Sequence, residues 1–422
     1  MIKGVKIRFE IHNILFSIYK FNKTLNDSSV KKQINKQRKE DISFLYNVTL
    51  NSIRLHLHCL KIIKIFIKKK LRDQEKILLI SAITQIVFLE FKEYAVINCS
   101  VEIAKKLKLY PGLINACLKK ITENKNNLKQ IKINFGDLPL WFQKKGSFLS
   151  DYEKKEFIKH FHKEPHIHII FKNEEKLKEF ENKLFKTSNI SGFLLDKKNF
   201  QHINSFVNGD WWVQDFSSFL PLYSFEEIDK NMLFLDACAA PGGKSFQILS
   251  KKLKVVLNDK NKTRIKTLED NLKRLKLNAK ILNKDFIQFD NERKYDVIII
   301  DAPCSALGTI RRNPEIFFKN KGPNFNKLIS LQEKMLEKAA ILLNSNGFII
   351  YMTCSFLKIE TIDQIEKFLE NNNNFSISEF KLKENSSDYS KLIKNNFMLT
   401  IPNVIFNYNI DGYFAAFLKK IK

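Results

Sequence analysis

The chain has 422 residues, of which 44% are hydrophobic and 28% are charged, with 12 glycines and 9 prolines. This composition supplies enough apolar surface for packed cores, and it excludes a mostly disordered chain and collagen-like or proline-rich architectures. The formal charge of +27, from 72 basic and 45 acidic residues, favours a polyanionic partner.

The positive charge is distributed unevenly along the chain. Residues 1–140 hold 27 basic and 11 acidic residues, residues 141–230 hold 14 of each, and residues 231–422 hold 31 and 20. Biased codon use explains part of the lysine excess, but it does not explain the neutral middle segment. We therefore favour nucleic acid as the partner, because Lys and Arg neutralise phosphates.

Membrane and secretion signals are not expected. No uninterrupted apolar stretch approaches ~18 residues, and no apolar segment near the N-terminus is followed by a small-residue cleavage site. Six cysteines are too few and too scattered for a disulfide framework. They indicate a reducing compartment, and we expect the cytoplasm.

Residues 1–135 are predicted to be helical. Ile80, Ile83 and Val87 have the i, i+3, i+7 spacing of one buried helical face. Three cysteines on similar apolar patterns are predicted to be buried hydrophobic residues rather than reactive thiols: Cys59, Cys99 and Cys117.

Residues 136–205 are predicted to form a small α/β element, with a strand over 166–171 and a helix over 174–184. Four histidines lie in or near that strand: His160, His162, His166 and His168. Their spacing fits no zinc pattern, so we predict outward-facing imidazoles and no metal site.

From residue 206 onward, short apolar runs alternate with helical stretches. The strands expected are 233–235, 255–257, 279–282, 295–300, 348–352 and 413–418, and the intervening helices 245–252, 263–275 and 328–343. This alternation predicts a Rossmann-like α/β domain over 206–422, with a parallel sheet covered on both faces.

The segment DACAAPGGKS, residues 236–245, leads from the first of these strands through a glycine-rich turn into a helix. Ligands of such sheets bind at the carboxyl ends of the strands, and Gly242 and Gly243 allow close approach of the backbone. The pattern is neither GxGxxG nor the Walker loop, so it does not support NAD or a nucleoside triphosphate.

Acidic residues follow the next two strands. Asp259 comes about 20 residues after the glycine turn, where an acid binds ribose hydroxyls in Rossmann-type sites. Asp285 follows the third strand and could accept a hydrogen bond from an adenine amino group. For both residues the competing interpretation is a helix cap.

Two further cysteines end strands. Cys304 follows the 295–300 strand in DAPCS, and Cys354 follows the 348–352 strand in YMTCS. Each sits at a strand-to-loop exit among polar residues, so we predict that both face one crevice. No CxxC pair occurs, which argues against a metal centre.

Together, DACAAPGGKS, DAPCSALGTIRRNPEI (301–316) and YMTCS (351–355) resemble the Sun/NOP2 class of RNA cytosine-5 methyltransferases. The motif-level resemblance covers about residues 210–422. The RRNPEI extension, the helical N-terminal block and the closing DGYFAAFLK are most similar to the bacterial 16S ribosomal RNA branch of this class. That branch has an N-terminal domain resembling the RNA-binding antitermination factor NusB.

The resemblance implies three domains: a NusB-like domain (1–135), a small α/β connecting element (136–205) and a class I methyltransferase domain (206–422).

The resemblance also implies S-adenosyl-L-methionine as the methyl donor. Asp259 would hold the ribose, Asp285 would lie by the adenine, and Asp301 would line the pocket for the donor and cytosine. The loop around the donor would consist of Cys238, Ala239, Ala240, Pro241, Gly242, Gly243 and Lys244.

In this class the two strand-end thiols have separate roles. Cys354 would be the nucleophile that adds to C6 of cytosine and makes C5 reactive, and Cys304 would assist breakdown of the adduct. Asp301 would act near N3, and Lys244 is one candidate neighbour for lowering a thiol pKa. The target base must leave any stack to reach the crevice.

The expected substrate is 16S rRNA, either free or within an assembling small-subunit particle, with no DNA or membrane partner and a monomeric enzyme. Two alternatives stay open: a tRNA cytosine-5 methyltransferase of the same family, and a catalytically inactive RNA-binding ribosome assembly factor. A generic Rossmann-like domain with an unrelated ligand is a further alternative.

The chain departs from the class after YMTCS, where only Glu360 remains of a usual Glu-Glu-Asn segment.

Overall fold

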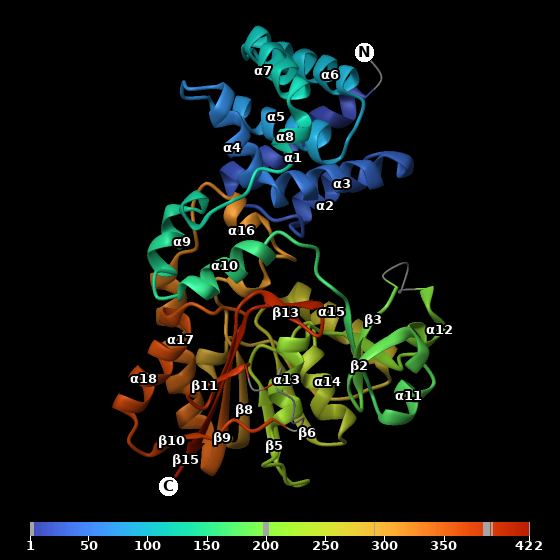
Figure 1. The fold of residues 1–422 in the computed structure, drawn as a ribbon. Helices are drawn as coiled ribbons and strands as arrows, with labels where there is room; N and C mark the ends of the chain where they lie inside the picture. The colour runs from blue at the N-terminus through green and yellow to red at the C-terminus, as the bar shows by residue number, and fades with distance from the viewer. Residues whose placement is uncertain (1–3, 197–201, 291, 383–388, 390, 422) are drawn as a thin grey trace. The chain divides into compact units, whose positions relative to one another are not determined.

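The computed structural model describes residues 4–196, 202–290, 292–382, 389 and 391–421. The chain forms two compact units (Figure 1). The N-terminal unit comprises Met1–His162 and Asn313–Pro323, and the C-terminal unit comprises Lys163–Arg312 and Asn324–Lys422. The division into three domains expected from the sequence stays a prediction.

The N-terminal unit is helical. Its helices are α1 (Val5–Phe21), α2 (Ser28–Asn35), α3 (Lys39–Arg54), α4 (His56–Phe66), α5 (Asp73–Ile83), α6 (Glu93–Lys106), α7 (Pro111–Glu123), α8 (Lys125–Leu128), α9 (Leu140–Lys145), α10 (Asp151–His160) and α16 (Glu315–Phe318). A π-helix, Thr84–Phe88, continues α5, and the face predicted from Ile80, Ile83 and Val87 is buried. The three cysteines predicted to be core residues are buried as well.

Residues 313–323 belong to the N-terminal unit although they follow the strand that carries Cys304. Phe318 lies in the core of the helical bundle, with its ring centroid 5.3 Å from that of His56. The backbone N–H of Asn320 donates to the carbonyl of Tyr19 at 3.0 Å. The local hydrophobic pattern of residues 313–323 does not show which distant segment they contact. The sequence therefore did not predict their packing in the N-terminal unit.

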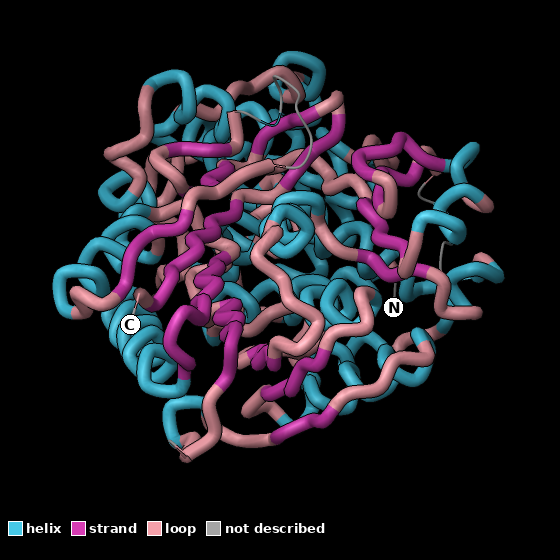
Figure 2. The backbone as a smooth tube through the Cα atoms, turned by 90° about the horizontal axis from the view of Figure 1, so that it is seen from below, coloured by secondary structure: helices cyan, strands magenta, loops and turns pink. Residues whose placement is uncertain are grey.

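The C-terminal unit contains a large mixed sheet. Its strands are β5 (Leu233–Asp236), β6 (Lys254–Asn258), β7 (Lys280–Leu282), β8 (Tyr295–Asp301), β9 (Leu343–Thr353), β10 (Phe375–Ser378), β11 (Ile393–Lys394), β12 (Phe397–Thr400) and β15 (Tyr413–Lys420). The strands have the order β11-β12-β15-β9-β8-β5-β6-β7, and β10 pairs with β15. Figure 2 shows the strands in magenta among the cyan helices. The β7-β6-β5-β8-β9 part is parallel, and β15 is antiparallel to β9.

Apolar side chains fill both faces of this sheet. Phe234, Leu257 and Ile299 point into one core, whereas Leu235, Val256 and Ile300 point into the other. The remaining helices of the unit are α11 (Glu174–Lys178), α12 (Asn204–Val207), α13 (Phe216–Ser224), α14 (Gly243–Ser250), α15 (Lys262–Leu275), α17 (Phe325–Leu342) and α18 (Ile362–Asn371). The prediction of a parallel sheet with two covered faces is confirmed for strands β5 to β9, whereas β15, the last strand expected, pairs antiparallel with β9.

A second, four-stranded sheet has the order β2-β3-β1-β4, formed by β1 (His168–Phe171), β2 (Leu184–Ser188), β3 (Ser191–Leu194) and β4 (Trp211–Val213). It extends past residue 205, because β4 pairs with β1. The predicted helix over 174–184 is wrong in length. Helix α11 ends at Lys178 and β2 begins at Leu184, because pairing with β3 overrides the helical pattern. A short hairpin, β13 (Asn403–Ile405) with β14 (Tyr408–Ile410), completes the strands.

The prediction of outward-facing imidazoles is wrong. The side chain of His168 is fully buried, with Nδ1 3.0 Å from the carbonyl of Gln214 and Nε2 2.9 Å from the hydroxyl of Thr187. His160 is buried on helix α10 rather than on a strand. A ring whose two nitrogens both have partners tolerates burial, which alternation along a strand does not reveal.

Acid is expected to destabilise the C-terminal unit through His168. Burial lowers the pKa of its imidazole from 6.5 to about 4, so the unfolded chain binds a proton that the folded chain excludes. Stability is therefore lost as pH falls from about 6.5 towards 4. His168→Gln should reduce the dependence of the unfolding free energy on pH in that window by up to about 1.4 kcal/mol per pH unit. Urea denaturation at several pH values measures this slope, and an unchanged slope would contradict the assignment.

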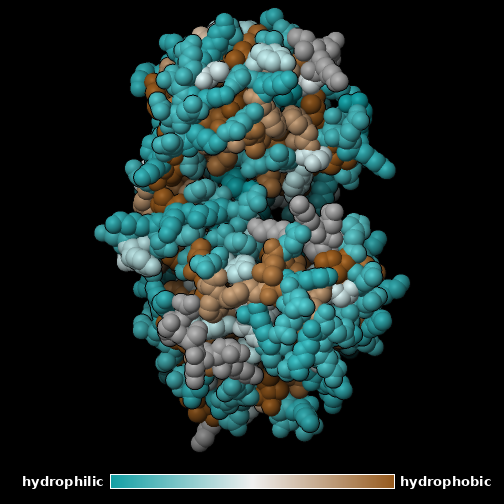
Figure 3. All heavy atoms as spheres, turned by 45° about the vertical axis from the view of Figure 1, so that its right-hand side comes forward, coloured by the Kyte–Doolittle hydropathy of each residue, from teal (hydrophilic) through white to brown (hydrophobic). Residues whose placement is uncertain are grey.

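On the face seen in Figure 3 most side chains are hydrophilic, and apolar ones gather in smaller patches. No helix in the described ranges is both long and apolar enough to cross a membrane.

Candidate active site

The candidate site lies where the parallel strand order reverses. Strand β5 has β6 on one side and β8 on the other, so the loops after β5 and β8 diverge and leave room for a ligand between them. The glycine turn follows β5. Its backbone is fixed to the next strand, since Ala239 N–H donates to the Asn258 carbonyl at 2.8 Å and Asn258 Nδ2 donates to the Ala237 carbonyl at 3.1 Å.

Gly242 is the N-cap of helix α14 and lies in the left-handed region, with φ +115°. A Cβ atom at this position would lie 2.0 Å from Cζ of Phe246 and 2.8 Å from Cδ1 of Leu268. Glycine is therefore required both for the backbone angle and for the packing of the turn against its own helix.

Gly242→Ala is expected to destabilise the C-terminal unit by about 2–4 kcal/mol, from backbone strain plus the steric clash with Phe246. Urea denaturation measures the loss. Gly112→Ala is the matched control, because no atom lies within 4 Å of the added Cβ. That residue is in helix α7, where alanine should stabilise by up to about 1 kcal/mol. Equal stability of the two variants would contradict this account of the turn.

Asp259 directly follows β6 and is 3% exposed. Its Oδ1 accepts from Asn261 N–H at 2.9 Å, whereas its buried Oδ2 accepts no hydrogen bond and lies 3.2 Å from Nη1 of Arg264. The cap of helix α15 is Asn261, which accepts from Thr263 N–H and Arg264 N–H. The capping alternative for Asp259 is therefore wrong, and one of its oxygens is available to a ligand.

A cavity brings Asp259 together with two of the other donor-site candidates. Cys238, Asp259 and Asp285 all line it. Its apolar walls come from Phe286, Ile287, Pro303, Leu331 and Met335. Asp285 also caps a short 3₁₀ turn by accepting from Ile287 N–H at 3.2 Å, so its capping alternative is correct without removing it from the cavity. Carboxylates with apolar walls match the hydroxyls and flat base of an adenosine group.

Asp301 connects the glycine turn to the last strand. Its Oδ2 is 2.7 Å from Nζ of Lys244, and its Oδ1 accepts from the hydroxyl of Tyr413 at 3.1 Å. Burial alone would lower the pKa of Lys244, but the charge and hydrogen bond of Asp301 raise it above its usual value. Burial and the charge of Asp301 raise the pKa of Tyr413, so this phenol keeps its proton. The three side chains form a fixed polar wall.

The two strand-end cysteines meet, as their positions predict. Sγ of Cys304 lies 3.4 Å from Sγ of Cys354, because β8 and β9 are parallel neighbours. The hydrogen bond to Cys354, together with burial, raises the pKa of the Cys304 thiol well above its usual value. Cys304 thus holds its proton and can donate it towards the sulfur of Cys354.

Glu360 accepts hydrogen bonds from both cysteine-bearing loops and so links them. Its Oε1 accepts from Ser305 N–H at 2.8 Å, and its Oε2 accepts from the hydroxyls of Ser305 at 2.5 Å and Ser355 at 2.7 Å. Gln332 Nε2 donates to Oε1 at 3.4 Å and to the Pro303 carbonyl at 2.9 Å. The glutamate is fully buried. The residues beside both thiols are therefore held by one carboxylate.

The sequence prediction missed two parts of this arrangement. The sequence placed Tyr413 only at the start of a predicted strand. It identified Glu360 only as the residue that remains of the Glu-Glu-Asn segment usual in the class. The signal for Tyr413 was its place directly after Asp411-Gly412, a short polar turn before a buried strand. Only contact between sequence-distant loops brings Tyr413 to Asp301 and Glu360 to Ser305.

Known proteins match both units of the chain. Residues 225–419 match the family model described as 16S rRNA methyltransferase RsmB/F, and residues 6–123 match the NusB family. Ribosomal RNA small subunit methyltransferase B from Shewanella oneidensis is 34% identical over 195 residues, which is 45% of this chain and 43% of that protein. The protein of the same name from Pasteurella multocida is 35% identical over 201 residues, 45% of this chain and 42% of that protein. Each match thus spans less than half of the relative's length.

Two solved structures share the fold. The crystal structure of PH0851 superposes with a TM-score of 0.70 at 20% identity, covering 100% of this chain and 99% of that one. NSun6 from Pyrococcus horikoshii, solved with SFG, gives 0.57 at 17% identity over 67% and 98% of the two chains. On the evidence of the two family models, residues 225–419 are a methyltransferase domain of the RsmB/F family, and residues 6–123 are a domain of the NusB family.

Proposed function

We propose that this protein transfers a methyl group from S-adenosyl-L-methionine to C5 of a cytosine in 16S rRNA. The observation that carries the proposal is the pair of thiols, 3.4 Å apart, at the ends of two adjacent parallel strands. Membership of residues 225–419 in the RsmB/F family and the names of the similar relatives support the substrate class.

The residues around the cavity suit the methyl donor. Oδ2 of Asp259, which accepts no hydrogen bond, is available to ribose hydroxyls, and Asp285 with its neighbour Phe286 is available to an adenine ring. Bound there, S-adenosylmethionine supplies an electrophilic methyl group. Cys238, at the start of the glycine-rich loop, lines the cavity, and Lys244, at the end of the loop, forms the ion pair with Asp301. The loop therefore extends from the donor cavity to Asp301.

Covalent catalysis then explains the need for two cysteines. The thiolate of Cys354 forms a bond to C6 of cytosine, which gives C5 the electron density to take the methyl group. Water accepts the proton of C5, the electron pair of that C–H bond re-forms the C5=C6 double bond, and the C6–Sγ bond breaks to release the Cys354 thiolate. Cys304, which holds its proton beside Cys354, assists this last stage. Asp301, positioned by Lys244 and Tyr413, stabilises charge at N3 as the thiolate adds.

The substrate is tested by incubating the full chain with labelled S-adenosylmethionine and a 16S rRNA transcript, with tRNA in parallel, followed by nucleoside analysis. We expect label in 5-methylcytidine from the 16S transcript. Label only in tRNA would keep the chemistry and replace the substrate. Donor binding with no label in either RNA, or in immature small-subunit particles, would favour an RNA-binding assembly factor.

A further inference from the structure

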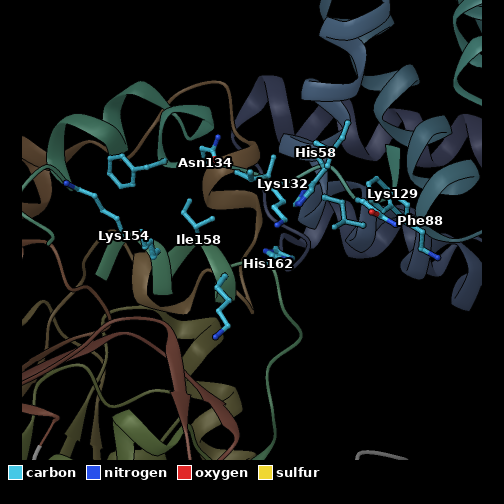
Figure 4. A pocket seen from close by; sticks show the side chains of 15 residues that line it. His58, Phe88, Lys129, Lys132, Asn134, Lys154, Ile158 and His162 are labelled. Atoms are coloured by element: carbon cyan, nitrogen blue, oxygen red, sulfur yellow. The ribbon is translucent and has the colours of Figure 1, made fainter. Parts of the chain in front are cut away.

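The N-terminal unit contains a cavity remote in sequence from the strand-end motifs. It has a volume of about 680 Å³, within the ~300–1,000 Å³ range of ligand sites. Its lining comes from α4, the π-helix, the segment after α8 and helix α10 (Figure 4). Side chains from these separate elements face the same hollow, among them His58, Lys132 and Ile158.

Aromatic and aliphatic side chains form the walls. On one wall the ring centroid of His58 lies 6.0 Å from that of Phe88 and 5.2 Å from that of His162, both edge to face. Burial lowers the pKa of His58 to about 4, so its imidazole is neutral and acts as an aromatic surface. Phe135 and Ile158 contribute apolar surface to the lining and are only partly buried. A flat apolar ligand can therefore be held between rings.

The lining carries positive charge and no carboxylate. It includes Lys129, Lys132, Lys154, Lys155 and Lys159. Lys129, Lys154 and Lys159 pair with carboxylates outside the lining, Glu90, Asp151 and Glu156. In the part of the chain that the structure describes, Lys132 and Lys155 are exposed, and neither has a carboxylate partner. These two ammonium groups are available to an anion.

We propose that this cavity binds an unpaired nucleotide of RNA, with the base among the aromatic walls and the adjoining phosphates at Lys132 and Lys155. Bases stack on aromatic side chains while cations neutralise the backbone, and this cavity offers both within one site. Helix α10 lies beyond the end of the NusB-family match at residue 123, so the site combines that domain with the segment following it. The inference rests on the proposed function for its RNA partner.

Binding is measured with the full chain and no methyl donor, so that the result is independent of catalysis. The probe is an oligouridylate of about 12 nucleotides. The double variant Lys132→Ala/Lys155→Ala should bind about tenfold more weakly at ~50 mM salt, and the slope of log affinity against log salt should fall by about 1.4. Lys31→Ala/Lys32→Ala is the matched control, since both lysines are exposed on α2, outside the cavity. Equal weakening in the two double variants would overturn the site and leave a diffuse charge effect.

The role of the base is tested with an abasic oligonucleotide of the same length. It should bind at least about fivefold more weakly than oligouridylate, and Phe135→Leu should reduce that difference. Equal binding of the two oligonucleotides, or equal displacement of RNA by polyglutamate of the same charge, would overturn the base site. Failure to methylate 16S rRNA, with these binding differences intact, would remove the proposed function and keep the nucleotide site.

Discussion

Replacing Cys354 with alanine is expected to abolish methyl transfer to RNA, with a loss of about 10⁴-fold or more in rate. The variant lacks the only group proposed to bond to C6 of cytosine, and without that bond C5 is a poor nucleophile. Donor binding should be unchanged, because Cys354 does not line the cavity with Asp259 and Asp285. Single-turnover transfer of labelled methyl to the RNA substrate measures the rate, and equilibrium binding of the donor measures the control.

Cys304→Ala should instead accumulate a covalent protein–RNA complex that survives denaturing electrophoresis. In this variant Cys354 still adds to the base, but the neighbouring thiol that assists breakdown is absent. Cys117→Ala is the matched thiol control, since Cys117 is buried in helix α7 of the N-terminal unit. The opposite result, a trapped complex in Cys354→Ala and none in Cys304→Ala, would exchange the two roles.

Strand positions and the meeting of the two thiols could be predicted because they depend on local patterns and one topological rule. Runs such as 295–300 are strongly β-branched and end at a polar residue, and neighbouring parallel strands end at the same edge. The order of β8 and β9 then determines that Cys304 and Cys354 are adjacent.

Features that depend on contacts between sequence-distant segments could not be predicted. Phe318 follows the cysteine-bearing loop in sequence but is buried in the core of the helical unit. His168 alternates like a surface residue, yet its two ring nitrogens find partners on separate segments. These hydrogen-bond partners are distant in sequence and come close only in the folded chain. The hydrophobic pattern of the sequence therefore does not show which polar side chains are buried.

Glu360→Gln is expected to lower kcat by about 100-fold, because displacing reacting groups by about 1 Å has an effect of that size. The carboxylate accepts from three side chains and one backbone N–H, all of them donors. A glutamine amide would present its own donors to Ser305 or Ser355, and one loop would have to move. Both cysteines are one residue from these serines, so the 3.4 Å separation of the thiols would be lost. KM for the methyl donor should stay the same, because Glu360 is not part of the donor cavity.

A lower kcat with an unchanged KM distinguishes misplacement of the two thiols from a general loss of stability. A merely destabilised enzyme has fewer folded molecules, and warming would inactivate it further, whereas cooling would restore its rate. A misaligned pair of thiols stays slow at every temperature at which the fold persists. Glu333→Gln is the matched control, because this glutamate forms a partly exposed pair with Lys367 at 2.7 Å, and such pairs contribute about 1 kcal/mol or less. An unchanged kcat in a folded Glu360→Gln variant would show that the loops hold the thiols in place without the carboxylate.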